Sequence, residues 1–223
     1  MKSENVSTFI LKSFLAGVMI GIGGLAYIAT GNPWVFPIGL FVVCAYDLRL
    51  FTGKICYLEY SPEAFLMMWC FNTVGACIFG LICRVMKPGL IEKAVVVSNT
   101  KLSENWPQIA MLAVLCNLMI FLAVDFWRRR GSYDPYPLRI GDMVGFAGLI
   151  FATAVFVICG FEHCIANAFY FSFAGADVVA VWKFLIINTI FNAVGGIEAR
   201  KLLRIKEISP WEPYEPHFSD KKE

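Results

Sequence analysis

The sequence predicts an all-α membrane protein with six transmembrane helices, two of them broken, arranged as an inverted repeat. Three observations predict it: the composition, apolar blocks of span length, and two interrupted segments in corresponding positions. The chain has 223 residues, 58% of them hydrophobic and 16% charged, with a mean hydropathy of +0.65. A soluble domain carries about 45–50% apolar and about 25% charged residues. The apolar excess recurs along the whole chain, which is typical of repeated membrane spans.

Four uninterrupted segments are long enough to cross a bilayer, which takes about 20 mostly apolar residues. They are Ile10–Ala29, Ala64–Met86, Ile109–Trp127 and Val178–Ile197. Ser61 is placed to cap the second of these, with Pro62 at its first helical position.

Two further apolar segments are interrupted. Val35–Cys44 is too short to cross alone, and we expect its helix to break at Leu50–Lys54. Met143–Cys159 meets a break at Gly160–His163 and resumes as Cys164–Phe173. Non-helical backbone is tolerated at membrane depth only where protein or a cavity surrounds it. The two breaks therefore predict a protein-lined cavity.

The two halves of the chain follow the same order of span, broken span and span. Their last spans share a pattern, Asn72-x-x-Gly75 in one and Asn192-x-x-Gly195 in the other. Paired interrupted segments indicate an inverted repeat with a transport site at its interface. We expect these boundaries: a transmembrane pore domain over residues 1–208, with repeats at about 9–86 and 107–205, and a cytoplasmic tail over 209–223.

Basic residues predict the orientation, because Lys and Arg concentrate in cytoplasmic loops. With six crossings, both basic clusters lie on the side of the N-terminus. They are Arg128, Arg129, Arg130 and Arg139 after the fourth span, and Arg200, Lys201, Arg204 and Lys206 after the last. We expect a multi-pass protein of the cell (inner) membrane with both termini in the cytoplasm.

Composition also excludes several classes of function. A net charge of +2 without a basic stripe argues against nucleic-acid binding. The eight Cys form no Cys-x-x-Cys pair, so we interpret them as small buried apolar residues, and the two His cannot ligate haem across two membrane helices. We expect no metal and no cofactor. No carboxylate pair, Ser-His-Asp set or phosphate loop accompanies the breaks, so we expect no enzyme activity.

Polar side chains at the breaks are the candidates for chemistry. His163 is the histidine at membrane depth and can exchange a proton near neutral pH. Thr52 offers a hydroxyl donor, and Asn117 and Asn192 offer amides. Each has an alternative role: His163 held by a backbone carbonyl, Thr52 as a helix cap, and the amides as interhelical hydrogen bonds.

Four motifs together resemble the formate/nitrite transporter family. They are Leu50-Phe51-Thr52-Gly53, Cys116-Asn117-Leu118-Met119, Asn192-Ala193-Val194-Gly195-Gly196, and Gly160-Phe161-Glu162-His163 with the following Cys164-Ile165-Ala166-Asn167. The resemblance extends from about Lys12 to Leu203. It implies an aquaporin-like fold assembled as a homopentamer with one pore in each subunit.

The resemblance also implies roles for individual residues. His163 is the central pore histidine and Thr52 its partner, with Glu162 beside them in the motif. The other implied pore residues are Leu50, Phe51 and Phe156 at the outer constriction, the amides Asn117 and Asn192, and the vestibule lysines Lys12 (cytoplasmic) and Lys101 (periplasmic).

Arg49 and Lys54 depart from the family pattern and are candidates for selectivity. The family often has an acidic residue in place of Arg49 and a neutral one in place of Lys54. Arg49 can pair with Asp47, and Lys54 can face the inner mouth.

The sequence thus predicts a transporter or channel for small monovalent weak-acid anions, with proton exchange at the central histidine. Formate or nitrite is favoured and hydrosulfide stays open; the expected partners are the anion, protons and the lipid bilayer. Two alternatives remain: a membrane-anchoring subunit of an enzyme complex, and a neutral-solute pore, although the paired Asn-Pro-Ala breaks of such pores are missing.

Overall fold

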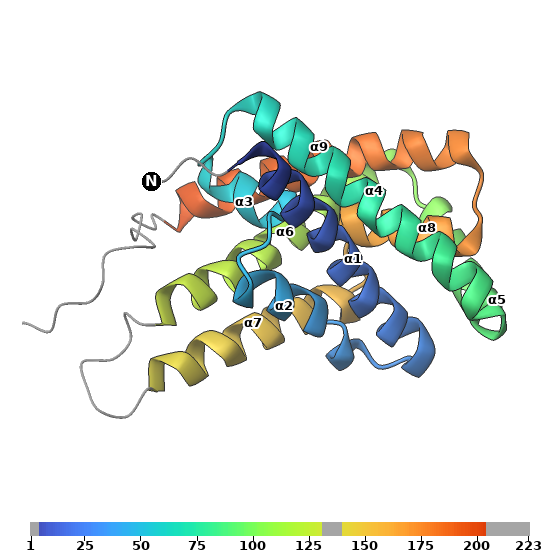
Figure 1. The fold of residues 1–223 in the computed structure, drawn as a ribbon, viewed down its shortest axis with the longest axis horizontal. Coiled ribbons are helices and arrows are strands. Elements are labelled where there is room, and N and C mark those ends of the chain that lie inside the picture. Colours follow the sequence, from blue (N-terminus) through green and yellow to red (C-terminus); the bar gives the residue numbers. More distant parts are fainter. Residues whose placement is uncertain (1–4, 131–139, 204–223) are drawn as a thin grey trace, which may run out of the picture.

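The computed structural model describes residues 5–130 and 140–203, which fold into a bundle of helices without a strand (Figure 1). The helices are α1 (Val6–Thr30), η1 (Pro33–Val35), α2 (Ile38–Ala45), α3 (Phe51–Lys54), η2 (Ile55–Tyr57), α4 (Pro62–Met86), η3 (Pro88–Leu90), α5 (Ile91–Leu102), α6 (Trp106–Arg129), α7 (Ile140–Ile158), α8 (Cys164–Ala174) and α9 (Val178–Leu202).

Within the described residues, five helices are long and apolar enough to cross a membrane: α1, α4, α6, α9 and residues Gly141–Ile158 of α7. Two shorter apolar helical segments, Pro33–Ala45 and Cys164–Ala174, accompany them.

The all-helical class is confirmed. The count of six crossings stays a prediction, because α2 and α3 are each too short to cross the membrane alone. The domain boundaries also stay predictions, and the tail over 209–223, Arg139, Arg204 and Lys206 lie outside the described residues.

Local sequence signals set the helix ends. The Ser61 side chain accepts a hydrogen bond from the Ala64 N–H at 3.3 Å, which confirms the predicted cap of α4. Asn105 and Gln108 form a reciprocal capping box at the start of α6.

The predicted position of the second break is confirmed, and that of the first is wrong by about four residues. The chain leaves the helix at 46–50 and is helical again at Phe51, so Thr52 and Gly53 lie inside α3. Gly53 and the polar residues around it predict a break at Leu50–Lys54, but the turn occurs earlier, at Asp47, whose φ is 46°.

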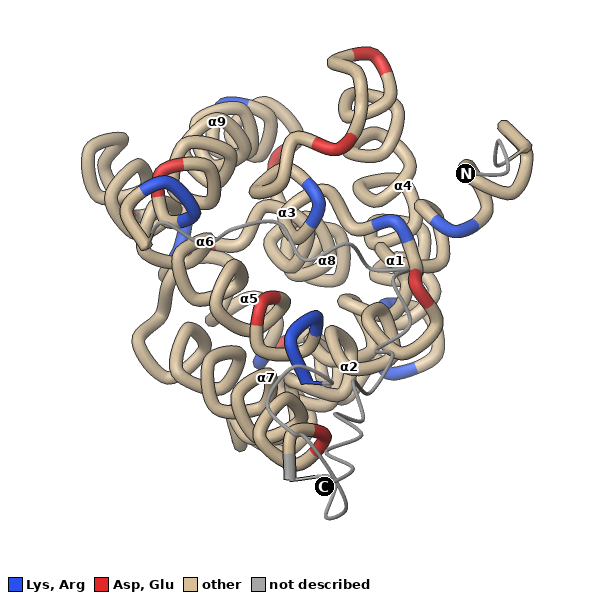
Figure 2. The backbone as a smooth tube through the Cα atoms, turned by 90° about the vertical axis from the view of Figure 1, so that its left-hand side faces the viewer, with Lys and Arg blue, Asp and Glu red and all other residues tan. Residues whose placement is uncertain are grey.

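The two halves pack in equivalent ways, α1 against α4 and α6 against α9. A Cβ at Gly75 would lie 2.2 Å from the Phe14 carbonyl oxygen of α1, and a Cβ at Gly195 would lie 2.4 Å from that of Val114 in α6. Only glycine permits either approach. α3 and α8 lie near the middle of this arrangement (Figure 2).

Each of the two half-helices ends at an arginine that comes from the other repeat of the chain. Arg84 of α4 donates to the carbonyl oxygens of Phe173 and Ala174 at the end of α8, at 3.1 and 2.6 Å. Arg200 of α9 donates to the carbonyl oxygen of Tyr57 at the end of η2, at 2.7 Å. A guanidinium there satisfies terminal carbonyls and opposes the negative end of the helix dipole.

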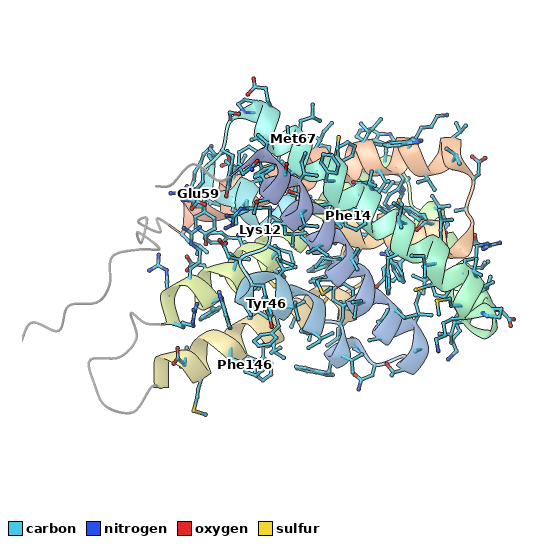
Figure 3. All side chains as sticks on the ribbon, viewed as in Figure 1. Lys12, Phe14, Tyr46, Glu59, Met67 and Phe146 are labelled. Atoms are coloured by element: carbon cyan, nitrogen blue, oxygen red, sulfur yellow. The ribbon has the colours of Figure 1, made fainter. Side chains whose placement is uncertain are left out.

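Basic residues cluster at one end of the bundle, which we call the α3 end. The start of α1 and the last turns of α6 and α9 lie there, and Figure 3 shows Lys12 and Glu59 toward the same end. Arg128 pairs with Glu59 at 2.6 Å, and Arg129 with Asp125 at 2.7 Å. The opposite end, which carries α5, is called the α5 end.

All eight cysteines are free thiols. Cys70 and Cys159 are exposed, so the expectation of uniform burial is wrong for these two. Both lie on apolar helices, where a small apolar residue is also suited to a lipid-facing surface.

Candidate pore site

The two breaks bring together Thr52 and His163, which are 111 residues apart in the chain. Thr52 Oγ1 lies 2.9 Å from His163 Nε2, and both side chains are almost fully buried, at 0% and 1% exposure. Thr52 lies in the first turn of α3, and His163 directly precedes α8. The contact therefore joins the starts of the two half-helices.

The other nitrogen of His163 defines its tautomer. His163 caps α8, and its Nδ1 accepts a hydrogen bond from the Ala166 N–H at 3.2 Å. An accepting Nδ1 carries no proton, so we assign the proton of the neutral ring to Nε2, which donates to Thr52 Oγ1. The Thr52 hydroxyl hydrogen then remains available to a third group.

Two asparagines hold the backbone at the breaks in the same way. Asn72 Oδ1 accepts from the Phe51 N–H at 2.8 Å, and its Nδ2 donates to the carbonyl oxygens of Ser13 and Arg49 at 2.6 and 2.8 Å. The half-helix α3 thus starts at a hydrogen bond to an asparagine of the neighbouring span α4.

Asn192 repeats this arrangement in the second half. Its Oδ1 accepts from the Cys164 N–H at 2.9 Å, and its Nδ2 donates to the carbonyl oxygens of Ala113 and Glu162, both at 2.8 Å. Both amide hydrogens are occupied, so none is left for a ligand in this structure. In the sequence, Asn72 stands out only as one half of the Asn-x-x-Gly repeat, and that pattern does not predict this role.

Asn117 has unused hydrogen-bonding capacity at the site. Its Nδ2 donates to the Thr52 carbonyl oxygen at 3.1 Å and lies 3.5 Å from Cys56 Sγ. Its Oδ1 is buried and has no partner among the described residues.

An apolar ring covers one face of His163. The Phe156 ring stacks on His163 with centroids 5.8 Å apart and an interplanar angle of 22°, and Phe156 is 3% exposed. Leu50 and Phe51, next to Thr52 in the chain, are also buried, at 2% and 6% exposure, and the Phe51 ring packs on Phe65. A solute that reaches this face of His163 therefore has to displace Phe156.

Glu162 is fully buried and is held by two donors. Lys101 Nζ lies 2.6 Å from its Oε1, and Asn167 Nδ2 donates to its Oε2 at 2.5 Å. The Lys101 side chain is only 12% exposed, so little water surrounds its ammonium group and Glu162 is the group that balances its charge. The nearby Glu104 has a pKa raised to about 7. Burial is the main cause and the negative charge of Glu162 is the second, while the positive charge of Lys101 acts in the opposite direction.

Arg49 and Lys54 share one carboxylate. Arg49 pairs with Asp47 at 2.7 Å and Lys54 pairs with it at 3.2 Å, which confirms the first of the two expected contacts. Lys12 lies partly buried on α1 at the same end of the bundle (Figure 3).

No group of three or more His, Cys, Asp or Glu side chains that could hold a metal occurs in residues 5–130 and 140–203.

These features define a multi-pass membrane protein built from two similar halves, each with a half-helix that begins at a buried polar contact. The chain belongs to the formate/nitrite transporter family, whose sequence model matches residues 2–203. The expected resemblance is confirmed, and the chain is a transport protein rather than an enzyme.

Individual relatives agree with this assignment. A probable formate transporter of Methanothermobacter thermautotrophicus is 29% identical over 84% of this chain and 84% of its own. A formate channel of Bacillus thuringiensis is 29% identical over 87% of this chain and 84% of its own. Among solved structures, a pentameric formate channel with formate bound superposes with a TM-score of 0.69 at 23% identity, over 89% of this chain and 95% of its own, and it supports the fold.

Proposed function

We propose that this protein carries formate, or another small monovalent weak-acid anion such as nitrite or hydrosulfide, across the cell membrane, with proton exchange at His163. The observation that carries the proposal is the 2.9 Å contact between Thr52 and His163 at the meeting point of the two half-helices. The names of the two relatives, a formate transporter and a formate channel, favour formate.

The chemistry of the site suits an anion. The Thr52 hydroxyl hydrogen is free to donate, and α8 directs the positive end of its dipole toward the contact. A full charge at the bilayer centre costs about 2.5–3.5 kcal/mol on insertion scales, so a proton transferred to the anion removes most of this barrier.

The proposed route of the proton starts from the tautomer with the proton on Nε2. The ring gains a proton at Nδ1, releases the Ala166 N–H and becomes cationic, which attracts the anion. It then gives the Nε2 proton to the anion, directly or through the Thr52 hydroxyl. The products are the neutral acid and a neutral ring protonated at Nδ1.

We further propose a homopentamer with one pore in each subunit and with both termini in the cytoplasm. The pentameric formate channel with the same fold supports the assembly, and the basic α3 end supports the orientation. In this arrangement the positive potential of the cytoplasmic mouth is raised by Lys12, Arg49 and Lys54. Lys101 lies on the external side. Leu50, Phe51 and Phe156 form the constriction.

Flux of formate, nitrite and hydrosulfide into liposomes tests the function. We expect His163→Phe and Thr52→Ala to reduce formate flux by about tenfold or more, because each removes a hydrogen bond to a charged solute. Thr52→Ser keeps the hydroxyl and is the matched control. Unchanged flux in both His163→Phe and Thr52→Ala would contradict the assigned roles.

The same preparation separates the alternatives. A neutral-solute pore would swell the liposomes in glycerol. An anchoring subunit would pass none of these solutes and would co-purify with an enzyme partner.

A further inference from the structure

Three charged groups from separate segments meet at the α5 end, next to the break that carries His163. Lys101 of α5 and Glu162 of the break form the 2.6 Å ion pair. Glu104, from the connection between α5 and α6, is close enough to both for their charges to act on its carboxyl.

The backbone fixes Glu104 in this position. Its N–H donates to the Lys101 carbonyl oxygen at 3.1 Å, and the capping box of Asn105 and Gln108 follows directly. The Glu104 Oε2 atom is buried and has no hydrogen-bond donor among the described residues. Both Glu162 oxygens already accept hydrogen bonds.

Two adjacent carboxylates repel each other, and they can share a hydrogen bond only when one of them carries a proton. Lys101 supplies one positive charge for two carboxyl groups. The three side chains are therefore neutral together when the pair holds one proton and carry a net charge of −1 when it holds none.

We propose that Glu104 is a positioning residue that holds a proton at the outer mouth and so sets how readily this protein admits anions as the external pH changes. The inference rests on the proposed anion transport and adds a pH-dependent control to it. With the proton in place, the mouth is neutral and Lys101 is freer to attract an anion. Without it, the negative mouth repels the anion.

The direction of the pH response follows from the groups that face Glu104. Glu162 and Lys101 are the charged residues that affect it within the described part of the chain, and with burial they raise the pKa of its carboxyl to about 7. The change in charge therefore falls near neutral pH. Anion uptake is expected to be stronger below this value than above it.

The test compares formate uptake by wild type and Glu104→Gln in liposomes, with the external pH at 6 or 8 and the internal pH fixed. Formate stays ionised at both values. Gln mimics the protonated carboxyl, so we expect equal flux at pH 6 and roughly three- to tenfold greater flux for the variant at pH 8, as expected for removal of one nearby charge. Glu92→Gln, at an exposed position on the same α5, is the control and should follow wild type at both values.

Thermal unfolding at several pH values supplies a second measurement that does not need transport. A carboxyl whose folded pKa is raised favours its protonated form, so wild type loses stability as pH rises from the unfolded pKa of 4.5 to about 7. The stability of Glu104→Gln relative to wild type should therefore increase over this range. A difference that is constant with pH would overturn the proton-holding role.

The two proposals fail in different ways. If wild type passes formate and the flux ratio of variant to wild type is the same at pH 6 and pH 8, the control by Glu104 is overturned and the proposed function stands. If wild type passes no anion, the proposed function is overturned, and the unfolding measurements still decide whether Glu104 holds the proton.

Discussion

At the scale of single residues, the asparagines have the clearest energetic role. Asn72 and Asn192 each satisfy one backbone N–H and two carbonyls at a break, where water is not available to replace them. Asn188, one turn earlier on α9, is equally buried, but neither of its amide atoms has a partner among the described residues.

Asn192→Leu is expected to destabilise the fold by at least about 2 kcal/mol, because it leaves several buried backbone groups unsatisfied. Asn188→Leu is the matched control on the same helix and should be neutral or stabilising. Thermal unfolding of purified protein in detergent measures both changes. Equal effects would mean that the hydrogen bonds of Asn192 do not hold the break.

The sequence predicted part of this site correctly. The resemblance to the family implied that Thr52 is the partner of His163, and the two side chains are in contact at 2.9 Å. The sequence did not predict that Lys101 would be neutralised by Glu162, since a contact between residues 61 apart depends on how α5 folds back. The role of Asn72 was also missed, although its repeat with Asn192 was a signal.

At the scale of helices, the glycines at the interfaces of α1 with α4 and of α6 with α9 determine how closely the spans approach. Gly75→Ala and Gly195→Ala are each expected to cost about 1–3 kcal/mol, because the new Cβ would meet a backbone carbonyl that cannot move alone.

Gly89→Ala is the control for this comparison. A Cβ at Gly89 has no atom within 4 Å, so the variant should unfold at the wild-type temperature. Loss of stability only in the two interface variants supports equivalent packing in the two halves. An unaffected Gly195→Ala would show that the α6–α9 interface relaxes.

The long helices were predictable because lipid imposes about 20 apolar residues on any helix that crosses it. The short half-helices were harder to predict from the sequence. α3 is only four residues long, and its start depends on the contact between Phe51 and Asn72 rather than on local preference. The residues around Gly53 in the sequence contain no information about the Asn72 side chain, which lies in the next span.

At the scale of the whole molecule, the proposed homopentamer predicts the mass of the purified protein. We expect the purified protein to have a mass of about five times the 25.0 kDa of one chain, once bound detergent is subtracted. Mass measurement in detergent distinguishes a pentamer from a monomer or dimer, either of which would contradict the proposal.

A reporter fused to the C-terminus tests the orientation independently. A protein that fluoresces only in the cytoplasm should be bright, and a phosphatase active only outside should be silent. The reverse pattern would place the basic α3 end outside.

The crossed arginine contacts restrict how such a molecule can open. Because Arg84 closes α8 and Arg200 closes η2, each half of the chain is anchored to the half-helix of the other. A rocking motion of one half against the other would break all three of these hydrogen bonds at once. Passage of a solute is therefore expected to depend on small rotations of the side chains around Phe156, with the scaffold at rest.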